Sequence, residues 1–154
     1  MKQKTFFMLK PDGVQLEEQI LDKIKAIAEI IAIRGYDKLP LEKIEALYLE
    51  HKDKKFYPWL VKYLNDNPAK AFVLEKKDGI KEDFFSLIDK IVGTTDPKKA
   101  LDGTIRSMSQ DNMEIAYSEN RAVQNLVHRA ENWACAQREG AIFFPNIFKK
   151  ENDG

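Results

Sequence analysis

The chain has 154 residues, which is enough for one ordinary domain with a substantial hydrophobic core and too few for two. Its 25 lysines and arginines balance 25 aspartates and glutamates, so we expect neither a membrane nor a nucleic acid among its partners. The single cysteine, Cys135, excludes an internal disulfide and fits a reducing, cytoplasmic location.

The first half of the chain predicts two strands and three helical segments. Bulky apolar residues at 4–9 end at the turn-forming residues 10–13, as in a buried strand, and this run is too short for a signal peptide or a membrane span. A second strand is expected at 30–39, before Pro40. Apolar residues recur every three or four positions, the spacing of one helix face, at 16–28, 41–48 and 59–64.

The second half of the chain alternates strand and helix again around a long polar loop. A third strand is expected at 69–75 and a short fourth strand at 125–128. Helices are expected at 81–92 and from the capping residue Asn132 to about Glu139. The loop at 93–106 is long, and loops of that length usually serve a site.

The order of these elements predicts the fold class. Two β-α-β units on one sheet give α/β (α+β) structure, here a ferredoxin-like sandwich with a four-stranded antiparallel sheet and helices covering one face. We expect residues 1–154 to form a single domain.

Histidine is scarce in this chain, which narrows the choice of a catalytic nucleophile. Of His51 and His128, only His128 directly follows a strand-like segment, 125–127. A neutral imidazole can attack phosphorus through its ring-nitrogen lone pair. By itself, however, a lone histidine is more often a core or turn residue satisfied by a backbone carbonyl, so the neighbouring residues must decide.

These neighbours resemble a known family. The sequence NLVH at 125–128, followed by AQRE at 136–139 and FFP at 143–145, is similar to the active-site signature of nucleoside diphosphate kinases. Four further blocks resemble the family in the same order: KPDGV at 10–14, YLEHKDKKF at 48–56, LVKYL at 60–64, and GTTDP with GTIR within 93–106. The resemblance extends over nearly the whole chain.

The resemblance implies a phosphoryl transfer in two half-reactions through phosphorylated His128, with Glu139 orienting the imidazole. It places Thr95 and Arg106 at the phosphates, although a solvated surface arginine is the alternative for Arg106. The remaining implied contacts are Lys10 near the ribose hydroxyl and the phosphates, and Asn125 at the sugar.

The nucleoside side of the site is implied by the same blocks. Phe56 corresponds to an aromatic on which any base can stack, and Leu60 supports it or is plain core. Tyr48 and His51 correspond to positions near the nucleophile and the phosphates, or they merely cap and pack a helix. Nucleoside di- and triphosphates are the implied partners, with Mg²⁺ bound mainly through their phosphates. The family also implies a homo-oligomer, with a hexamer favoured over a tetramer.

Three of the departures from the family pattern concern the site. Asp89 stands where the family usually has a phosphate-binding arginine, and Lys90, Arg121 or His51 could supply the missing cation. Ala130 lacks a hydroxyl thought to help the departing oxygen. Residues 107–124 are about twice as many as typical members have there, which predicts an insertion close to the base slot.

Two other functions remain open from the sequence. Asp89 and Ala130 are compatible with a catalytically weakened nucleotide-binding homologue that has a regulatory or scaffold role. A ferredoxin-like nucleic-acid-binding module with Phe56 as a stacking surface is the other alternative, but the chain has no basic stripe.

Overall fold

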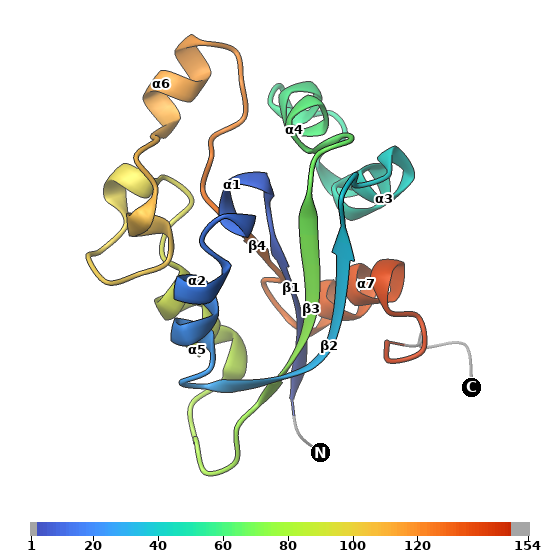
Figure 1. Ribbon diagram of the computed structural model, residues 1–154, viewed down its shortest axis with the longest axis vertical. Coiled ribbons are helices and arrows are strands. Elements are labelled where there is room, and N and C mark those ends of the chain that lie inside the picture. The colour runs from blue at the N-terminus through green and yellow to red at the C-terminus, as the bar shows by residue number, and fades with distance from the viewer. Residues whose placement is uncertain (1–2, 149–154) are drawn as a thin grey trace.

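The computed structural model describes residues 3–148, and its central element is a four-stranded sheet (Figure 1). The strands are β1 (Lys4–Leu9), β2 (Ala28–Tyr36), β3 (Ala69–Lys76) and β4 (Val127–Arg129). The helices are α1 (Pro11–Val14), α2 (Glu17–Ile24), α3 (Leu41–Leu47), α4 (Tyr57–Leu64), α5 (Phe84–Val92), α6 (Met113–Ser118) and α7 (Trp133–Phe143). Short 3₁₀ turns are η1 (Leu49–His51), η2 (Pro97–Lys99) and η3 (Arg106–Met108).

The sheet has the strand order β2-β3-β1-β4, and every neighbouring pair is antiparallel. The two β-α-β units interleave their strands, so β1 and β3 lie in the centre and β2 and β4 lie at the edges. This arrangement confirms the predicted ferredoxin-like α+β fold. On the edge strand β4, His128 lies directly opposite Met8 of β1.

Helices cover both faces of the sheet, whereas the sequence led us to expect one covered face (Figure 1). Phe6 and Met8 of β1 pack with residues of α3, α4 and α7, and Phe7 and Leu9 pack with residues of α2 and α5. The reason is visible in the apolar run of β1, since a strand with both faces buried reads as continuously hydrophobic.

Several predicted boundaries shift in the structure. The helical pattern at 16–28 ends earlier, because α2 stops at Ile24 and Ala28 already opens β2. The helix predicted from residue 81 begins at Phe84, where the Asp83 side chain accepts a hydrogen bond from the Ser86 amide and caps it. Asn132 caps α7 as expected, with its side chain accepting from the Cys135 amide at 2.9 Å.

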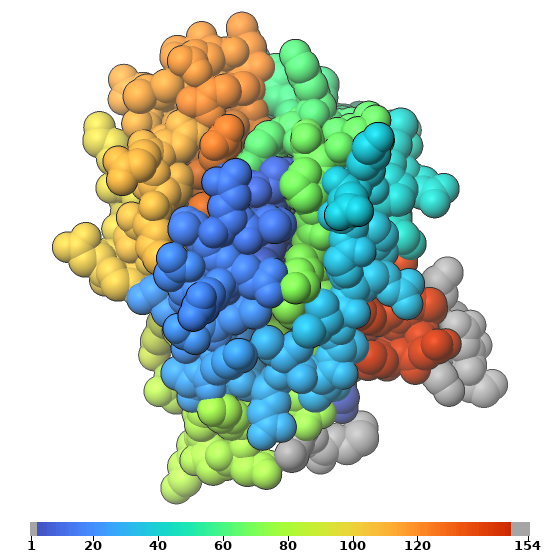
Figure 2. Space-filling model, viewed as in Figure 1, coloured from blue at the N-terminus to red at the C-terminus, as the bar shows by residue number. Residues whose placement is uncertain are grey.

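The segment 107–124 contains α6 and lies beside α4 at one end of the molecule (Figures 1 and 2). The rings of Trp59 on α4 and Tyr117 on α6 meet edge to face, with centroids 5.4 Å apart. Within residues 3–148, no helix has the length and apolarity that crossing a bilayer requires.

Candidate active site

A cavity of about 350 Å³ opens at the end of the molecule where α4 and α6 meet. Its wall contains every side chain that the sequence assigned to a site: Lys10, Tyr48, His51, Phe56, Leu60, Thr95, Arg106, Asn125, His128 and Glu139. These residues come from segments spread over most of the chain, and the fold gathers them at one edge of the sheet.

Among contacts within residues 3–148, His128 is the only histidine of the cavity that a carboxylate holds. Its position opposite Met8 turns the ring toward the α7 face, where Nε2 lies 2.6 Å from Oε1 of Glu139. Glu139 is itself buried on α7, and the Arg138 guanidinium lies 3.4 Å from its second oxygen. When Nε2 carries the proton that Glu139 accepts, the lone pair resides on Nδ1, for which residues 3–148 provide no hydrogen-bond partner.

The surroundings of His128 favour its neutral form. Burial lowers the pKa of His128, and the positive charges of Lys10 and Arg106 lower it further, while the bond to Glu139 opposes them. The rings of Phe6 and Tyr48 pack against the imidazole at centroid distances of 6.0 and 5.3 Å. The ring is therefore neutral, oriented and held between aromatic neighbours, as a nitrogen nucleophile requires.

Lys10 lies just past the end of β1 and reaches the sugar-side residue predicted from the sequence. Its Nζ donates to Oδ1 of Asn125 at 2.8 Å, and Nδ2 of Asn125 donates to the Thr95 carbonyl at 3.0 Å. Burial, together with the charge of Arg106, lowers the pKa of Lys10 to about 7. A buried ammonium without a carboxylate contact gains most when an anion enters the cavity.

Arg106 is a buried second cation, which excludes the solvated surface arginine as its role. Its guanidinium donates to the carbonyls of Gly93 and Val127 at 3.3 and 3.0 Å, so it bridges the long loop and β4. Burial and the neighbouring charge of Arg129 lower the pKa of Arg106 to about 10. A guanidinium has five N–H donors, and these two bonds leave the others available to oxygens of a ligand.

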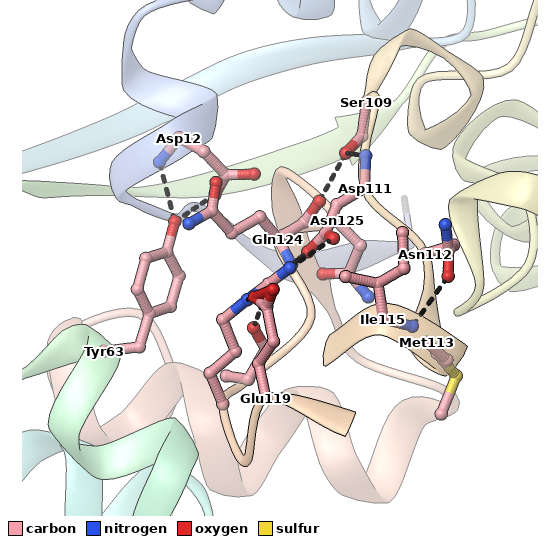
Figure 3. Close-up of polar contacts among 12 residues, drawn as sticks. Asp12, Tyr63, Ser109, Asp111, Asn112, Met113, Ile115, Glu119, Gln124 and Asn125 are labelled. Carbon is pink, nitrogen blue, oxygen red and sulfur yellow. Dashed lines mark hydrogen bonds and ion pairs between the residues drawn. The ribbon is translucent and has the colours of Figure 1, made fainter. Parts of the chain in front are cut away.

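Asp12 anchors the loop that leads into β4 (Figure 3). Its carboxylate accepts from the Leu126 amide at 3.0 Å and from the Tyr63 hydroxyl at 2.6 Å. Leu126 adopts a left-handed backbone conformation with φ of 76°, and a Cβ on Gly13 would lie 2.0 Å from its carbonyl oxygen. Close packing of α1 on Leu126 therefore constrains the backbone of the short segment between Asn125 and His128.

The opposite end of the cavity is aromatic. Phe56 precedes α4, packs its ring 5.5 Å from His51, and shares the wall with Leu60. Met113 and Tyr117 of α6 line the cavity from the inserted segment. The sequence placed this segment near the base slot but did not identify these two side chains, because no motif indicated which face of α6 would turn inward.

The inserted segment is closed on itself by polar contacts (Figure 3). Arg121 binds both oxygens of Asp111 at 2.6 and 2.8 Å and also pairs with Glu119 at 2.7 Å. Arg121 holds the pKa of Asp111 at about 2. Asn112 caps α6 through the Ile115 amide at 2.9 Å.

Comparison with known proteins decides the family. The family model for nucleoside diphosphate kinase matches residues 3–147. A nucleoside diphosphate kinase of Saccharolobus solfataricus is 34% identical over 144 residues, covering 92% of this chain and 94% of that protein. This chain belongs to the nucleoside diphosphate kinase family. It is therefore an enzyme, a phosphotransferase of nucleotide metabolism.

Solved structures of the nucleoside diphosphate kinase family have the same fold. An NDP kinase from Pyrobaculum aerophilum has a TM-score of 0.79 and 28% identity, covering 96% of this chain and 98% of that one. A nucleoside-diphosphate kinase from Borrelia burgdorferi, described as a transition state mimic with bound vanadate and ADP, has a TM-score of 0.83 and 24% identity. It covers 99% of this chain and 94% of that one, and at this identity the likeness concerns the fold.

Proposed function

We propose that this enzyme transfers the γ-phosphoryl group from a nucleoside triphosphate to a nucleoside diphosphate by a ping-pong mechanism through phosphorylated His128. One observation carries the proposal. His128 is only 16% exposed, its pKa is lowered, its Nε2 is held by Glu139, and Lys10 and Arg106 line the same cavity. A loose phosphoryl-transfer transition state requires an oriented nucleophile and several cations that stabilise the negative charge of the phosphate oxygens.

In the first half-reaction, the Nδ1 lone pair forms a bond to the γ-phosphorus while the bond to the bridging oxygen breaks. The nucleoside diphosphate leaves with that electron pair, and the proton remains on Nε2, where Glu139 balances the charge that develops on the ring. In the second half-reaction, a terminal oxygen of another diphosphate attacks the phosphorus and Nδ1 recovers its lone pair. No separate general base is needed, because neutral imidazole begins and ends the cycle.

The nucleotide would lie along the cavity with its phosphates toward His128, Arg106 and Thr95. Lys10 and Asn125, joined by their 2.8 Å hydrogen bond, would bind the sugar and the nearest phosphate. The base would stack on Phe56, and Met113 and Tyr117 would line the other side of the base-binding slot. A slot with mainly apolar and aromatic contacts accepts any base through its π-face, which supports broad specificity.

Mg²⁺ fits this site as an ion carried by the nucleotide. Within residues 3–148, no group of three histidine, cysteine or acidic side chains is placed to hold a metal. The phosphates would supply most of its oxygen ligands, and Mg²⁺ would neutralise their charge when bound.

We also propose that the enzyme is a cytoplasmic homo-oligomer, with a hexamer favoured over a tetramer. The edge strand β2 exposes Ile31 and Ile33, and the loop before Arg106 exposes Leu101. Exposed apolar residues on an edge strand and a projecting loop favour association with further copies.

Initial-rate kinetics with two nucleotides test the proposed reaction. We expect parallel lines in double-reciprocal plots, because the first product leaves before the second substrate binds. His128→Ala should abolish exchange and leave diphosphate affinity within a few-fold, whereas His51→Ala should retain measurable exchange. A weakened nucleotide-binding homologue would instead bind diphosphates with no exchange in the unsubstituted protein.

A further inference from the structure

Arg129 is a cavity residue that the sequence did not indicate. It follows His128 on β4 and lies opposite Phe7, so its side chain leaves the sheet toward α5, while His128 points toward α7. There its Nη2 donates to Oδ1 of Asp89 at 2.7 Å. Asp89 is the residue that stands where a phosphate-binding arginine was expected.

Two of the cations that could replace the missing arginine, Lys90 and Arg121, are already paired with carboxylates. Lys90 is exposed, pairs with Glu82 at 2.8 Å, and is not part of the cavity wall. Arg121 lines the cavity but directs Nε, Nη1 and Nη2 to two carboxylates, Asp111 and Glu119. Each of its nitrogens is therefore occupied.

Arg129 differs from Lys90 and Arg121 because a donor nitrogen of its side chain has no hydrogen-bond partner within residues 3–148. Its side chain is 20% exposed, and its buried Nε has no hydrogen-bond partner. Asp89, the carboxylate that pairs with Arg129, is 61% exposed, so solvent screens much of that charge. Arg129 and Arg106 both line the cavity, and the positive charge of Arg129 contributes to the lowered pKa of Arg106, which supports their acting on one ligand.

We propose that Arg129, held in position by Asp89, is a second guanidinium that binds the phosphate oxygens of the nucleotide beside Arg106. This inference rests on the proposed function, because it assigns a ligand contact in the same cavity. Arg129 would contact the ligand directly, and Asp89 would be a positioning residue that acts through it. Asp89 then supports phosphate binding, the opposite of the effect expected from its sequence position alone.

The pairing also explains how a carboxylate is compatible with this site. An arginine that uses one donor for Asp89 still presents the rest of its planar fork to phosphate oxygens. The ion pair limits the side chain to few rotamers, so less conformational entropy is lost when the nucleotide binds. Replacing Asp89 by arginine would remove this anchor and bring a third guanidinium near Arg106 and Arg129.

Calorimetric binding of ADP and of adenosine tests the proposal. Arg129→Ala and Arg129→Gln should weaken ADP binding by about ten- to hundredfold, the value of a charge-assisted contact, and leave adenosine binding within about twofold. Arg129→Lys should recover part of the loss, since it keeps the charge without the fork. Lys90→Ala, next to Asp89 on the same helix, is the matched control and should leave both affinities unchanged.

A double-mutant cycle tests the role of Asp89. Asp89→Ala alone should weaken ADP binding by a smaller factor than Arg129→Ala, and the double variant should bind like Arg129→Ala alone. Equal ADP affinity for Arg129→Gln and the unsubstituted protein, or additive effects in the cycle, would overturn the proposal. Because binding is measured without turnover, this failure is distinct from failure of the proposed reaction, which would appear as absent exchange in the unsubstituted protein.

Discussion

The cavity gathers positive charge around the imidazole of His128, and the surroundings of these charged groups make their charge costly. Lys10 and Arg106 are buried, and nearby carboxylates, Asp12 for Lys10 and Asp89 for Arg106, balance their charges only in part. Such an arrangement is destabilising without a ligand, because buried charges lack full compensation. A phosphate that enters the cavity would compensate these positive charges, so the cavity of the free protein favours binding of an anion.

The ionisation of His128 is the first property to measure at this scale. Its pKa is lowered, so the imidazole should stay neutral below about pH 6.5, the ordinary value for histidine, and remain nucleophilic there. NMR titration of the ring in the free protein should give a midpoint below this value. A midpoint above it would contradict the described burial.

Two variants should move that midpoint in opposite directions. Glu139→Gln removes the anion that raises the pKa of His128, so the midpoint should fall further. Lys10→Met removes a cation that lowers the pKa, so the midpoint should rise. Shifts of the same sign in both variants would show that packing, rather than charge, controls the titration.

Lys10 should also show a conflict between stability and function. Its folded pKa of about 7 lies below its ordinary 10.5, so the buried ammonium destabilises the protein most at and below pH 7. Lys10→Met should therefore raise the free energy of unfolding by roughly 1–4 kcal/mol at pH 7, while weakening nucleotide binding. The gain should shrink as the pH rises toward 10, and urea denaturation at several pH values measures it.

At residue level, the sequence predicted many of the residues that line the cavity, but not all of them. Lys10, Asn125, His128 and Glu139 lie in motifs that resemble those of the family, and that resemblance assigned them to a site; all four line the cavity. Arg129 could not be predicted in this way, because its partner Asp89 lies 40 residues away on α5 and no local spacing rule joins residues so far apart along the chain.

Among the elements, the close packing of α1 on the loop before β4 is the most sensitive feature. Gly13→Ala places a methyl group 2.0 Å from the Leu126 carbonyl oxygen, and backbone must move to accommodate it. We expect a loss of about 1–3 kcal/mol in unfolding free energy and a misplaced His128. Gly35→Ala on β2 is the matched control, since its methyl group would meet nothing within 4 Å.

Thermal or urea denaturation of both glycine variants measures the difference. Gly35→Ala should be neutral or stabilise the protein by about 0.4–1 kcal/mol through the unfolded chain. Equal effects of the two substitutions would mean that α1 can shift without loss of stability. The close contact between Gly13 and Leu126 would then not position the site.

The segment around α6 depends on one side-chain cluster. Asp111 accepts two bonds from Arg121 and one from the Gln124 amide, so Asp111→Ala should loosen residues 109–124 with little loss of global stability. Hydrogen exchange should speed up in that segment, and adenosine should bind more weakly because Met113 and Tyr117 lose their support. Glu119→Ala, which removes only an exposed pair, should change neither quantity.

Periodicity predicted most elements and missed some of their ends. The patterns at 4–9, 41–48 and 69–75 correspond to β1, α3 and β3 within a residue, because apolar residues there face a core. The pattern at 16–28 continued past the true end of α2, since the apolar residues of a helix and of the following strand merged. Coverage of both sheet faces depends on contacts between distant segments, which local spacing does not specify.

For the whole molecule, assembly is the property to test. Light scattering should give a mass several times that of one chain at micromolar concentration. Ile33→Lys should reduce the assembly, because it places a charge on the exposed edge strand β2, where this side chain is 55% exposed. Lys25→Ala, a change at another exposed position, should leave the mass unaltered. A single-chain mass for the unsubstituted protein would refute the proposed oligomer.

The central claim is that His128 carries the phosphoryl group between two nucleotides. The most direct measurement is the intact mass of the protein after incubation with ATP and Mg²⁺, without an acceptor, followed by addition of GDP. We predict a gain of one phosphoryl group per chain, located on His128, labile to acid and lost to GDP on addition. No gain in mass, an acid-stable product, or an equal gain in His128→Ala would contradict the account.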